Sequence, residues 1–224
     1  MQRPLTLLFG PVLRVALGLW IAAMVLSCQP AYAQAQQIQA GREYVRLNPP
    51  RPVVTGPRIE IIEFFYYGCP ICYEFQPHFS RWMFQAPDDI VLRRVPALSS
   101  ENWEPFARLF YSLELIGELN RLHWPVYDNF HFDDVMLNDE KVMLEWVVRN
   151  GLDRGKFTAA YGSDEVKDRL NRSCELMKSY DVRGVPSIIV DGKFQTSARL
   201  AGGTRQLAQM LDQLVKLARK ERPN

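Results

Sequence analysis

Two cysteines, Cys69 and Cys72, are separated by Pro70 and Ile71 and form a CxxC motif. The motif follows the mostly apolar segment 59–65 (IEIIEFF), which has the length and composition of a buried strand. The residues after the motif, up to about position 84, carry apolar side chains at helical spacing. A CxxC motif at a junction between a strand and a helix is typical of thiol–disulfide redox chemistry.

The two cysteines are expected to differ in reactivity because they occupy different places on the helix. Cys69 would lie at the N-terminus, where free backbone N–H groups and the helix dipole stabilise a thiolate and lower its pKa. Cys72 would lie nearly one turn further along, turned toward the core. The sequence therefore predicts one exposed sulfur that attacks or is attacked, and one sheltered sulfur that resolves the reaction.

Two other roles for the pair remain open on the residues alone. The cysteines could form an inert structural disulfide, or they could bind zinc, which needs four ligands and commonly uses two such pairs. The chain has one CxxC pair and three histidines, His78, His123 and His131, that form no partner pattern. We therefore expect redox chemistry without a bound metal or cofactor. Cys174 falls on a helical apolar stripe and is expected to be a small core residue.

Glu63 precedes Cys69 by six residues and lies within the expected strand. Alternation along a strand places Glu63 on the same face as Ile61 and Phe65, where burial would raise the pKa of its carboxyl group. A buried acid beneath a dithiol can pass a proton to or from the inner sulfur. The alternative is a glutamate at the strand end that reaches solvent.

The first 33 residues resemble a secretory signal. Arg3 and Arg14 precede an uncharged, mostly apolar segment at positions 15–26, and a small-x-small cleavage pattern ends at Ala33. We expect cleavage after Ala33 and export to the bacterial periplasm. An uncleaved membrane anchor and lipidation at Cys28 are the alternatives.

Charge and cysteine content narrow the class of protein further. Residues 34–224 contain 25 basic and 25 acidic side chains, and a neutral chain without basic blocks argues against nucleic acid as a partner. One close cysteine pair in an exported chain of this length is not a disulfide framework. The export signal implies an oxidising compartment, in which the pair is expected to be chemical rather than structural.

The remaining pattern predicts a mixed α/β protein. An edge strand is expected at 44–47, a second strand at 90–95 and a hairpin at 186–196 that turns at Asp191 and Gly192. Residues from about 99 to 180 show only helical patterns, with N-caps expected at Asn138 and Ser163. A terminal helix is expected to begin at Thr204.

Two distant stretches together resemble the DsbA family of bacterial periplasmic thiol:disulfide oxidoreductases. Residues 63–75 (EFFYYGCPICYEF) are similar to the family's active-site stretch, and residues 182–187 (VRGVPS), followed by DGKF, are similar to its cis-proline loop and hairpin. The resemblance implies a thioredoxin fold with an all-helical domain inserted. The implied division is a signal peptide at 1–33, thioredoxin-fold parts at 34–98 and 181–224, and the helical insertion at 99–180.

The resemblance also implies roles for individual residues. Cys69 would be the substrate-facing sulfur and Cys72 its buried partner, and Glu63 would match the family's buried acid. Pro186 would be cis beside the disulfide, and Val185 would offer backbone groups to an extended substrate peptide. On the residues alone, a trans proline at the start of a strand is the commoner outcome. The family pairs the buried acid with a basic residue, for which residues 93–94, both arginine, are two candidates.

Ile71 departs from the family's usual Pro-His dipeptide, while Pro70 is retained. In the family the histidine helps to stabilise the nucleophilic thiolate, and members are known for a strongly depressed cysteine pKa and strong oxidising power. Ile71 can neither donate a hydrogen bond nor carry charge. Ile71 is therefore expected to leave a less depressed Cys69 pKa and a weaker oxidant.

The expected function is a periplasmic oxidase that introduces disulfide bonds into exported proteins through Cys69 and Cys72. The resemblance implies unfolded exported protein thiols as substrates and a DsbB-type, quinone-linked inner-membrane oxidase as partner, with the chain as a monomer. A reductase or isomerase on the same fold is the alternative, although residues 34–57 leave no room for the isomerases' dimerisation domain. A metal-handling module is a third hypothesis from a different class.

Overall fold

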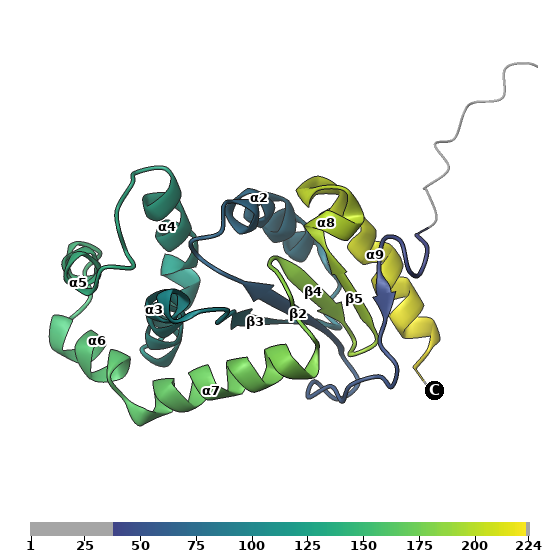
Figure 1. Cartoon of the computed structure of the whole chain (residues 1–224), viewed down its shortest axis with the longest axis horizontal. Coiled ribbons are helices and arrows are strands. Elements are labelled where there is room, and N and C mark those ends of the chain that lie inside the picture. The colour runs from purple at the N-terminus through teal and green to yellow at the C-terminus, as the bar shows by residue number, and fades with distance from the viewer. Residues whose placement is uncertain (1–37, 223–224) are drawn as a thin grey trace, which may run out of the picture. The chain divides into compact units, whose positions relative to one another are not determined.

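The computed structural model describes residues 38–222, and its strands form one mixed five-stranded sheet in the order β1-β5-β4-β2-β3 (Figure 1). The strands are β1 (Val45–Arg46), β2 (Ile59–Phe65), β3 (Ile90–Pro96), β4 (Ser187–Val190) and β5 (Phe194–Ser197). Strands β2 and β3 are parallel, whereas the other neighbouring strands are antiparallel. The predicted α/β class and all the predicted strands are confirmed.

Strand β2 is inside the sheet and every one of its residues is buried. A strand covered on both faces reads as a nearly continuous apolar segment, and this explains why the sequence predicted its bounds so well. The β4–β5 turn has positive φ angles at Asp191 (55°) and Gly192 (62°). A Cβ atom at Gly192 would lie 2.1 Å from the backbone oxygen of Arg51, so both the turn and its packing require glycine.

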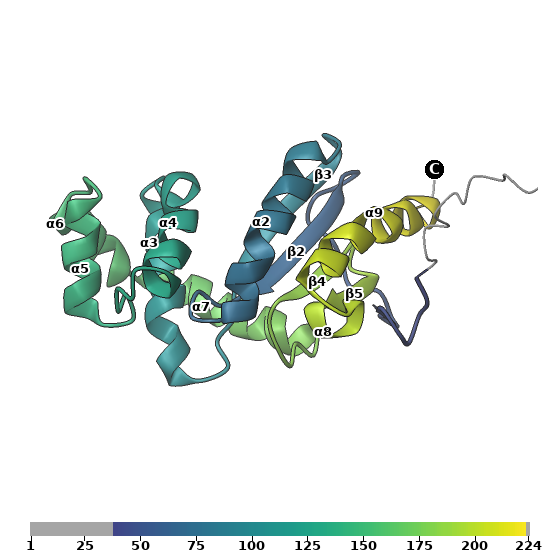
Figure 2. The same cartoon turned by 90° about the horizontal axis from the view of Figure 1, so that it is seen from above.

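Two of the helices, α2 and α9, cover one face of the sheet side by side (Figure 2). Their side chains pack around Ile59 and Ile61, whereas the alternate residues Ile62 and Phe64 pack on the other face against Met177 and Tyr180. The helices are α2 (Pro70–Gln85), α3 (Glu104–Leu115), α4 (Leu119–His131), α5 (Glu140–Arg149), α6 (Arg154–Tyr161), α7 (Asp164–Ser179), α8 (Ala198–Ala201), α9 (Thr204–Lys220) and the 3-10 turn η1 (Glu101–Trp103).

All secondary structure between β3 and β4 is helical, as the sequence predicted. Helices α3 to α6 gather to one side of the sheet (Figures 1 and 2) and share a large aromatic core with the end of β2, including Phe65. Ser163 caps α7 as expected. The other predicted cap was wrong by one residue, because Asp139, not Asn138, accepts the hydrogen bond from the backbone N–H of Val142.

The prediction that Cys174 is a core residue was wrong, since Cys174 is only half-buried. Ser173 takes the inward position instead and its hydroxyl lies 2.5 Å from that of Tyr111. The reason is helical geometry, because seven residues after Val166 complete nearly two turns of 3.6 residues, while eight residues overshoot them. A small hydroxyl therefore lies where a thiol was expected.

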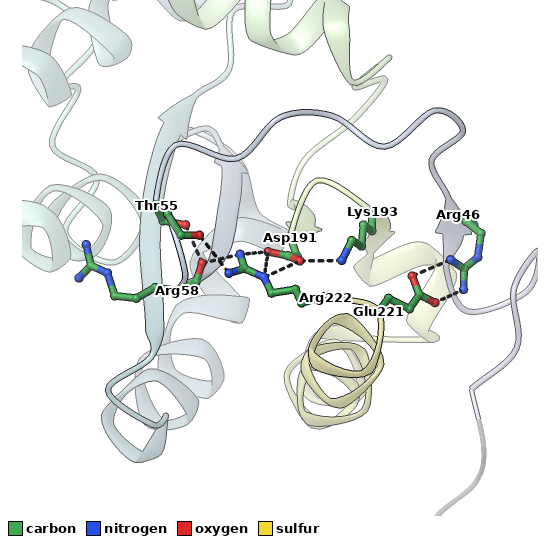
Figure 3. Close-up of polar contacts among 8 residues, drawn as sticks. Arg46, Thr55, Arg58, Asp191, Lys193, Glu221 and Arg222 are labelled. Atoms are coloured by element: carbon green, nitrogen blue, oxygen red, sulfur yellow. Dashed lines mark hydrogen bonds and ion pairs between the residues drawn. The ribbon is translucent and has the colours of Figure 1, made fainter. Parts of the chain in front are cut away.

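A polar network holds the C-terminus against the end of the sheet opposite the CxxC motif (Figure 3). Asp191 is almost fully buried and accepts hydrogen bonds from the guanidinium group of Arg222, while Lys193 lies 3.1 Å away. Arg222 also donates to the backbone oxygens of Gly56 and Arg58. The network ties the chain before β2, the β4–β5 turn and the residues after α9 to one another.

The predicted signal peptide, its cleavage after Ala33 and Cys28 lie outside the described residues. Within residues 38–222, none of the helices combines the length and the apolar character that crossing a membrane requires.

Candidate active site at the start of helix α2

Cys69 is the N-cap of α2, with extended backbone angles (φ −90°, ψ 116°). Its sulfur accepts a hydrogen bond from the backbone N–H of Cys72, with Sγ and N 3.3 Å apart. Pro70 is the first residue of the helix, a position where its missing N–H costs nothing. The local sequence therefore places the sulfur of Cys69 over the free N–H groups of the first turn.

The two thiols are free in this structure and have opposite environments. The pKa of Cys69 is lowered to about 6 by a hydrogen bond from the Cys72 thiol and by the backbone N–H groups of Cys72 and Ile71, although burial opposes this. Cys72 is fully buried, and burial together with its hydrogen bond to Cys69 raises its pKa well above the ordinary value. The predicted contrast between an accessible and a sheltered sulfur is confirmed.

Glu63 is fully buried in the middle layer of the protein, which excludes the solvent-exposed alternative. Its carboxyl oxygens accept hydrogen bonds from Gln76 of α2 (2.5 Å) and from Nε of Arg94 (3.1 Å). Burial raises the pKa of Glu63, and the charge of Arg94 opposes that shift. The charge of Glu63 in turn contributes to the raised pKa of Cys72, so the two groups are electrostatically coupled.

Arg94, rather than Arg93, is the basic partner that the sequence left open. Arg94 lies directly opposite Glu63 in the β2–β3 register, while Arg93 lies opposite Ile62. Because successive side chains on a strand point to opposite faces, only one of the two arginines can reach the carboxyl group.

The peptide bond between Val185 and Pro186 is cis, as the resemblance implied. The backbone oxygen of Val185 lies 3.7 Å from the sulfur of Cys69. This approach is a consequence of sheet topology, since β4 begins at Ser187 and pairs with β2. The structure thus brings Val185 and Pro186 to Cys69 across more than a hundred residues of chain. A second cis bond, between Asn48 and Pro49, was not predicted.

A groove of about 800 Å³ runs beside the cysteines. Ile71, Val185 and Pro186 are among its lining residues, and most of the others come from the loop before Val185, from β5 and α8, and from the start of α9. Ile71 is 45% exposed, so the CxxC motif presents an apolar side chain to the groove where the family's histidine would lie.

Sequence analysis missed a buried polar cluster beneath the cysteines. Nδ1 of His123 lies 2.8 Å from the hydroxyl of Tyr67, and Nε2 of His131 donates to the backbone oxygen of Tyr67 at 2.7 Å. Nε2 of His123 and the hydroxyl of Tyr127 are buried, and neither has a hydrogen-bond partner among the described residues. His123, Tyr127 and His131 recur every four residues on α4, a spacing that would have placed them on one face.

Within residues 38–222, no group of three or more histidine, cysteine, aspartate or glutamate side chains gathers closely enough to hold a metal ion.

Comparisons with known proteins place these features in one family. The family model described as DSBA-like thioredoxin domain matches residues 86–215. The thiol:disulfide interchange protein DsbA of Azotobacter vinelandii is 35% identical over 194 residues, 87% of this chain and 91% of that protein. DsbA of Bordetella parapertussis is 35% identical over 201 residues, 89% of this chain and 96% of that protein.

Solved structures show the same similarity in three dimensions. The crystal structure of Pseudomonas aeruginosa DsbA superimposes with a TM-score of 0.78 and 33% identity, covering 83% of this chain and 97% of that chain. The match extends over the sheet and the helical segment, so the architecture is a thioredoxin fold that carries additional helices. With its reactive cysteine pair at the start of α2, the chain belongs to the DsbA family of thiol:disulfide oxidoreductases.

Proposed function

We propose that the protein is a periplasmic oxidase that introduces disulfide bonds into exported proteins through Cys69 and Cys72. The observation that carries the proposal is the contrast between the two thiols, with the pKa of Cys69 lowered to about 6 and that of Cys72 raised by burial. A stabilised Cys69 thiolate favours the dithiol form of the enzyme over its disulfide. The transfer of the disulfide to a substrate is therefore thermodynamically favourable.

The reaction proceeds by two thiol–disulfide exchanges. A substrate thiolate attacks the sulfur of Cys69 in the Cys69–Cys72 disulfide, a mixed disulfide forms, and Cys72 leaves with the bonding electron pair. A second substrate thiolate then attacks the substrate sulfur of the mixed disulfide and releases Cys69 as a thiolate. The substrate dithiol loses two electrons and two protons, and the enzyme disulfide is reduced.

Glu63 is proposed to handle the proton of Cys72. The departing Cys72 thiolate is fully buried, and a buried anion without a cation partner is unfavourable, so it must gain a proton promptly. Glu63 lies beneath it with a raised pKa and can release a proton when Cys72 leaves and accept one when Cys72 is oxidised. Gln76 and Arg94 hold the carboxyl group in place and stabilise its charged form.

The groove beside Cys69 is proposed to bind the substrate as an extended peptide. Val185 and Pro186 border it at the position nearest to the sulfur. Backbone groups of Val185 can pair with a peptide in the manner of an added strand. The volume of the groove, about 800 Å³, suits a segment of unfolded chain rather than a small thiol.

We also propose the cellular setting that the family implies. Residues 1–33 act as a cleaved signal peptide, and the mature chain acts as a monomer in the periplasm. Residues 99–180 form a helical domain inserted between thioredoxin-fold parts at 34–98 and 181–224. A quinone-linked membrane oxidase of the DsbB type reoxidises the cysteine pair.

The test combines catalysis with a reduction potential. The oxidised protein should oxidise a reduced, unfolded secretory protein, and Cys69→Ser should abolish this reaction. In Cys72→Ser, the Cys69 thiolate can attack a disulfide of the oxidised substrate and should accumulate as a mixed disulfide, because no second enzyme thiol is present to resolve it. The Cys69–Cys72 potential, measured against glutathione buffers, should lie well above that of thioredoxin, about −270 mV. A potential near or below that of thioredoxin would reject the oxidase and favour a reductase.

A further inference from the structure

A second cavity lies away from the cysteine groove, at the outer edge of strand β3. It has a volume of about 190 Å³ and is bordered by β3, α3 and α7. Four arginines line it, two adjacent ones on β3, Arg93 and Arg94, and two on α7, Arg169 and Arg172. The sheet ends at β3, so side chains from both faces of this strand can reach the same opening.

The arginines of the cavity differ in how far their charge is compensated. Arg94 is paired with the buried Glu63, and Arg169 is paired with Glu114 and Glu165. Within residues 38–222, Arg93 and Arg172 make no hydrogen bond or ion pair. The charge of Arg93 lowers the pKa of the buried Glu60, but burial raises that pKa more strongly.

Hydroxyl groups form part of the same wall. Tyr111 and Ser173 both line the cavity, and their hydroxyl oxygens are 2.5 Å apart. Ser173 is 2% exposed and occupies the inward position of α7. The cavity thus combines guanidinium donors with buried hydroxyls, and Glu114 is the only acidic side chain among the described residues that line it.

We propose that this cavity binds a small tetrahedral oxyanion of the phosphate or sulfate class. Guanidinium groups are planar donors that match the oxygens of phosphate in pairs, and a dianion can compensate two cations that otherwise repel each other. The volume is below the range of pockets for drug-sized ligands, which begins at about 300 Å³, so the site suits an ion or a terminal phosphate group. The site shares Arg94 with the Glu63 pair, but neither cysteine lines it.

The test measures phosphate binding on the full-length chain, with and without the Cys69–Cys72 pair. Inorganic phosphate is titrated against the reduced protein and against the double variant Cys69→Ser, Cys72→Ser, with sodium chloride at equal ionic strength as the reference. Binding to the native state should raise the melting temperature of both proteins progressively with the phosphate concentration, since the stabilisation follows RT ln(1 + [L]/Kd). Arg172→Gln and Arg93→Gln should each weaken binding about tenfold, because each removes one charged hydrogen-bond donor.

Arg149→Gln is the matched control, since Arg149 is also exposed on a helix and lies outside the cavity. It should leave the phosphate affinity unchanged.

Glycerol phosphate and acetate extend the titration. Binding of glycerol phosphate as tight as that of inorganic phosphate identifies the end of a larger molecule as the ligand, and binding of inorganic phosphate alone identifies the free ion.

Three results would overturn the proposal. Phosphate could stabilise the wild-type protein no more than sodium chloride does, Arg149→Gln could weaken binding as much as Arg172→Gln, or acetate could bind as tightly as phosphate. Circular dichroism of each variant checks that the fold is intact. Because the double variant Cys69→Ser, Cys72→Ser gives the same readout, failure of the oxidase proposal leaves this test unaffected.

Discussion

Strand β2 carries a buried glutamate near each end, and the two carboxyl groups have different partners. Glu63 lies at the cysteine end and accepts hydrogen bonds from Gln76 and Arg94. Glu60 lies at the other end, and its Oε1 is buried without a hydrogen-bond partner among the described residues. Burial raises the pKa of both groups, and an arginine of β3 opposes the shift in each case.

The surroundings of the two glutamates explain what each end of the strand does. Near Glu60, the backbone oxygen of Glu60 accepts a hydrogen bond from Asp191, whose own carboxylate is held by Arg222 and Lys193 (Figure 3). Near Glu63, one arginine and one amide face a carboxyl group that lies beneath a reactive thiol pair. At the end of β2 near the β4–β5 hairpin (the hairpin end), two cations hold the carboxylate of Asp191 in its charged form. At the cysteine end, Glu63 can change its protonation state.

The largest effect should come from the fixed charges of the hairpin end. Asp191→Asn removes the carboxylate that Arg222 and Lys193 share, and we expect unfolding free energy to fall by about 2 kcal/mol, below the range for fully buried pairs because both cations are partly exposed. Asparagine tolerates the positive φ of this turn, so the substitution isolates the charge. Urea denaturation measures the loss.

The thiol chemistry is the control for this first prediction. The pKa of Cys69 in Asp191→Asn should equal that of the wild-type protein, because the network lies at the opposite end of the sheet. A change in that pKa would mean that the two ends of β2 are coupled.

The next effect concerns proton transfer. Glu63→Gln should slow the oxidation of substrate dithiols about tenfold, at the low end of the range for general acid–base catalysis since water can replace the carboxyl group in part. Glu60→Gln is the matched control, because it removes an equally buried carboxyl group on the other face of the same strand. Stopped-flow fluorescence with a reduced peptide measures both rates. Equal rates in the two variants would remove Glu63 from the mechanism.

A third effect tests the isoleucine of the CxxC motif. Ile71→His should lower the pKa of Cys69 from about 6 by roughly one unit, because a protonated histidine near the helix start favours the thiolate. Thiolate absorbance, followed as a function of pH, measures the shift. Ile71→Leu should leave it unchanged, and a histidine variant with the wild-type pKa would contradict the prediction.

The smallest effect is the pH dependence of stability from the two glutamates. A carboxyl group whose pKa is raised by folding contributes stability below its unfolded pKa, and this contribution is lost as pH rises through the folded pKa. Wild-type stability should therefore decline above about pH 4.5, the ordinary pKa of a glutamate side chain. Each of Glu60→Gln and Glu63→Gln should flatten that decline in urea denaturation series; an unchanged slope in both variants would contradict the raised pKa values.

Much of the fold followed from local sequence patterns. The bounds of β2, the cap at Cys69, the turn at Asp191 and Gly192 and the cap at Ser163 depend on interactions within a few residues. The predictions failed where one position decided the result. Asp139 is the cap instead of Asn138, and Ser173 lies in the core instead of Cys174. In both cases two adjacent residues have similar size or polarity, so the sequence does not show which of them faces the cap position or the core.

The sequence alone determined the reactive pair, its order along α2 and the family resemblance, since a CxxC motif after a buried strand constrains geometry locally. Only the tertiary structure decided the rest of the site. Strand register selected Arg94 as the partner of Glu63, and sheet pairing brought Val185 to Cys69. The arginine cavity draws on three elements far apart in the chain, and local patterns cannot predict such contacts because they depend on packing between elements.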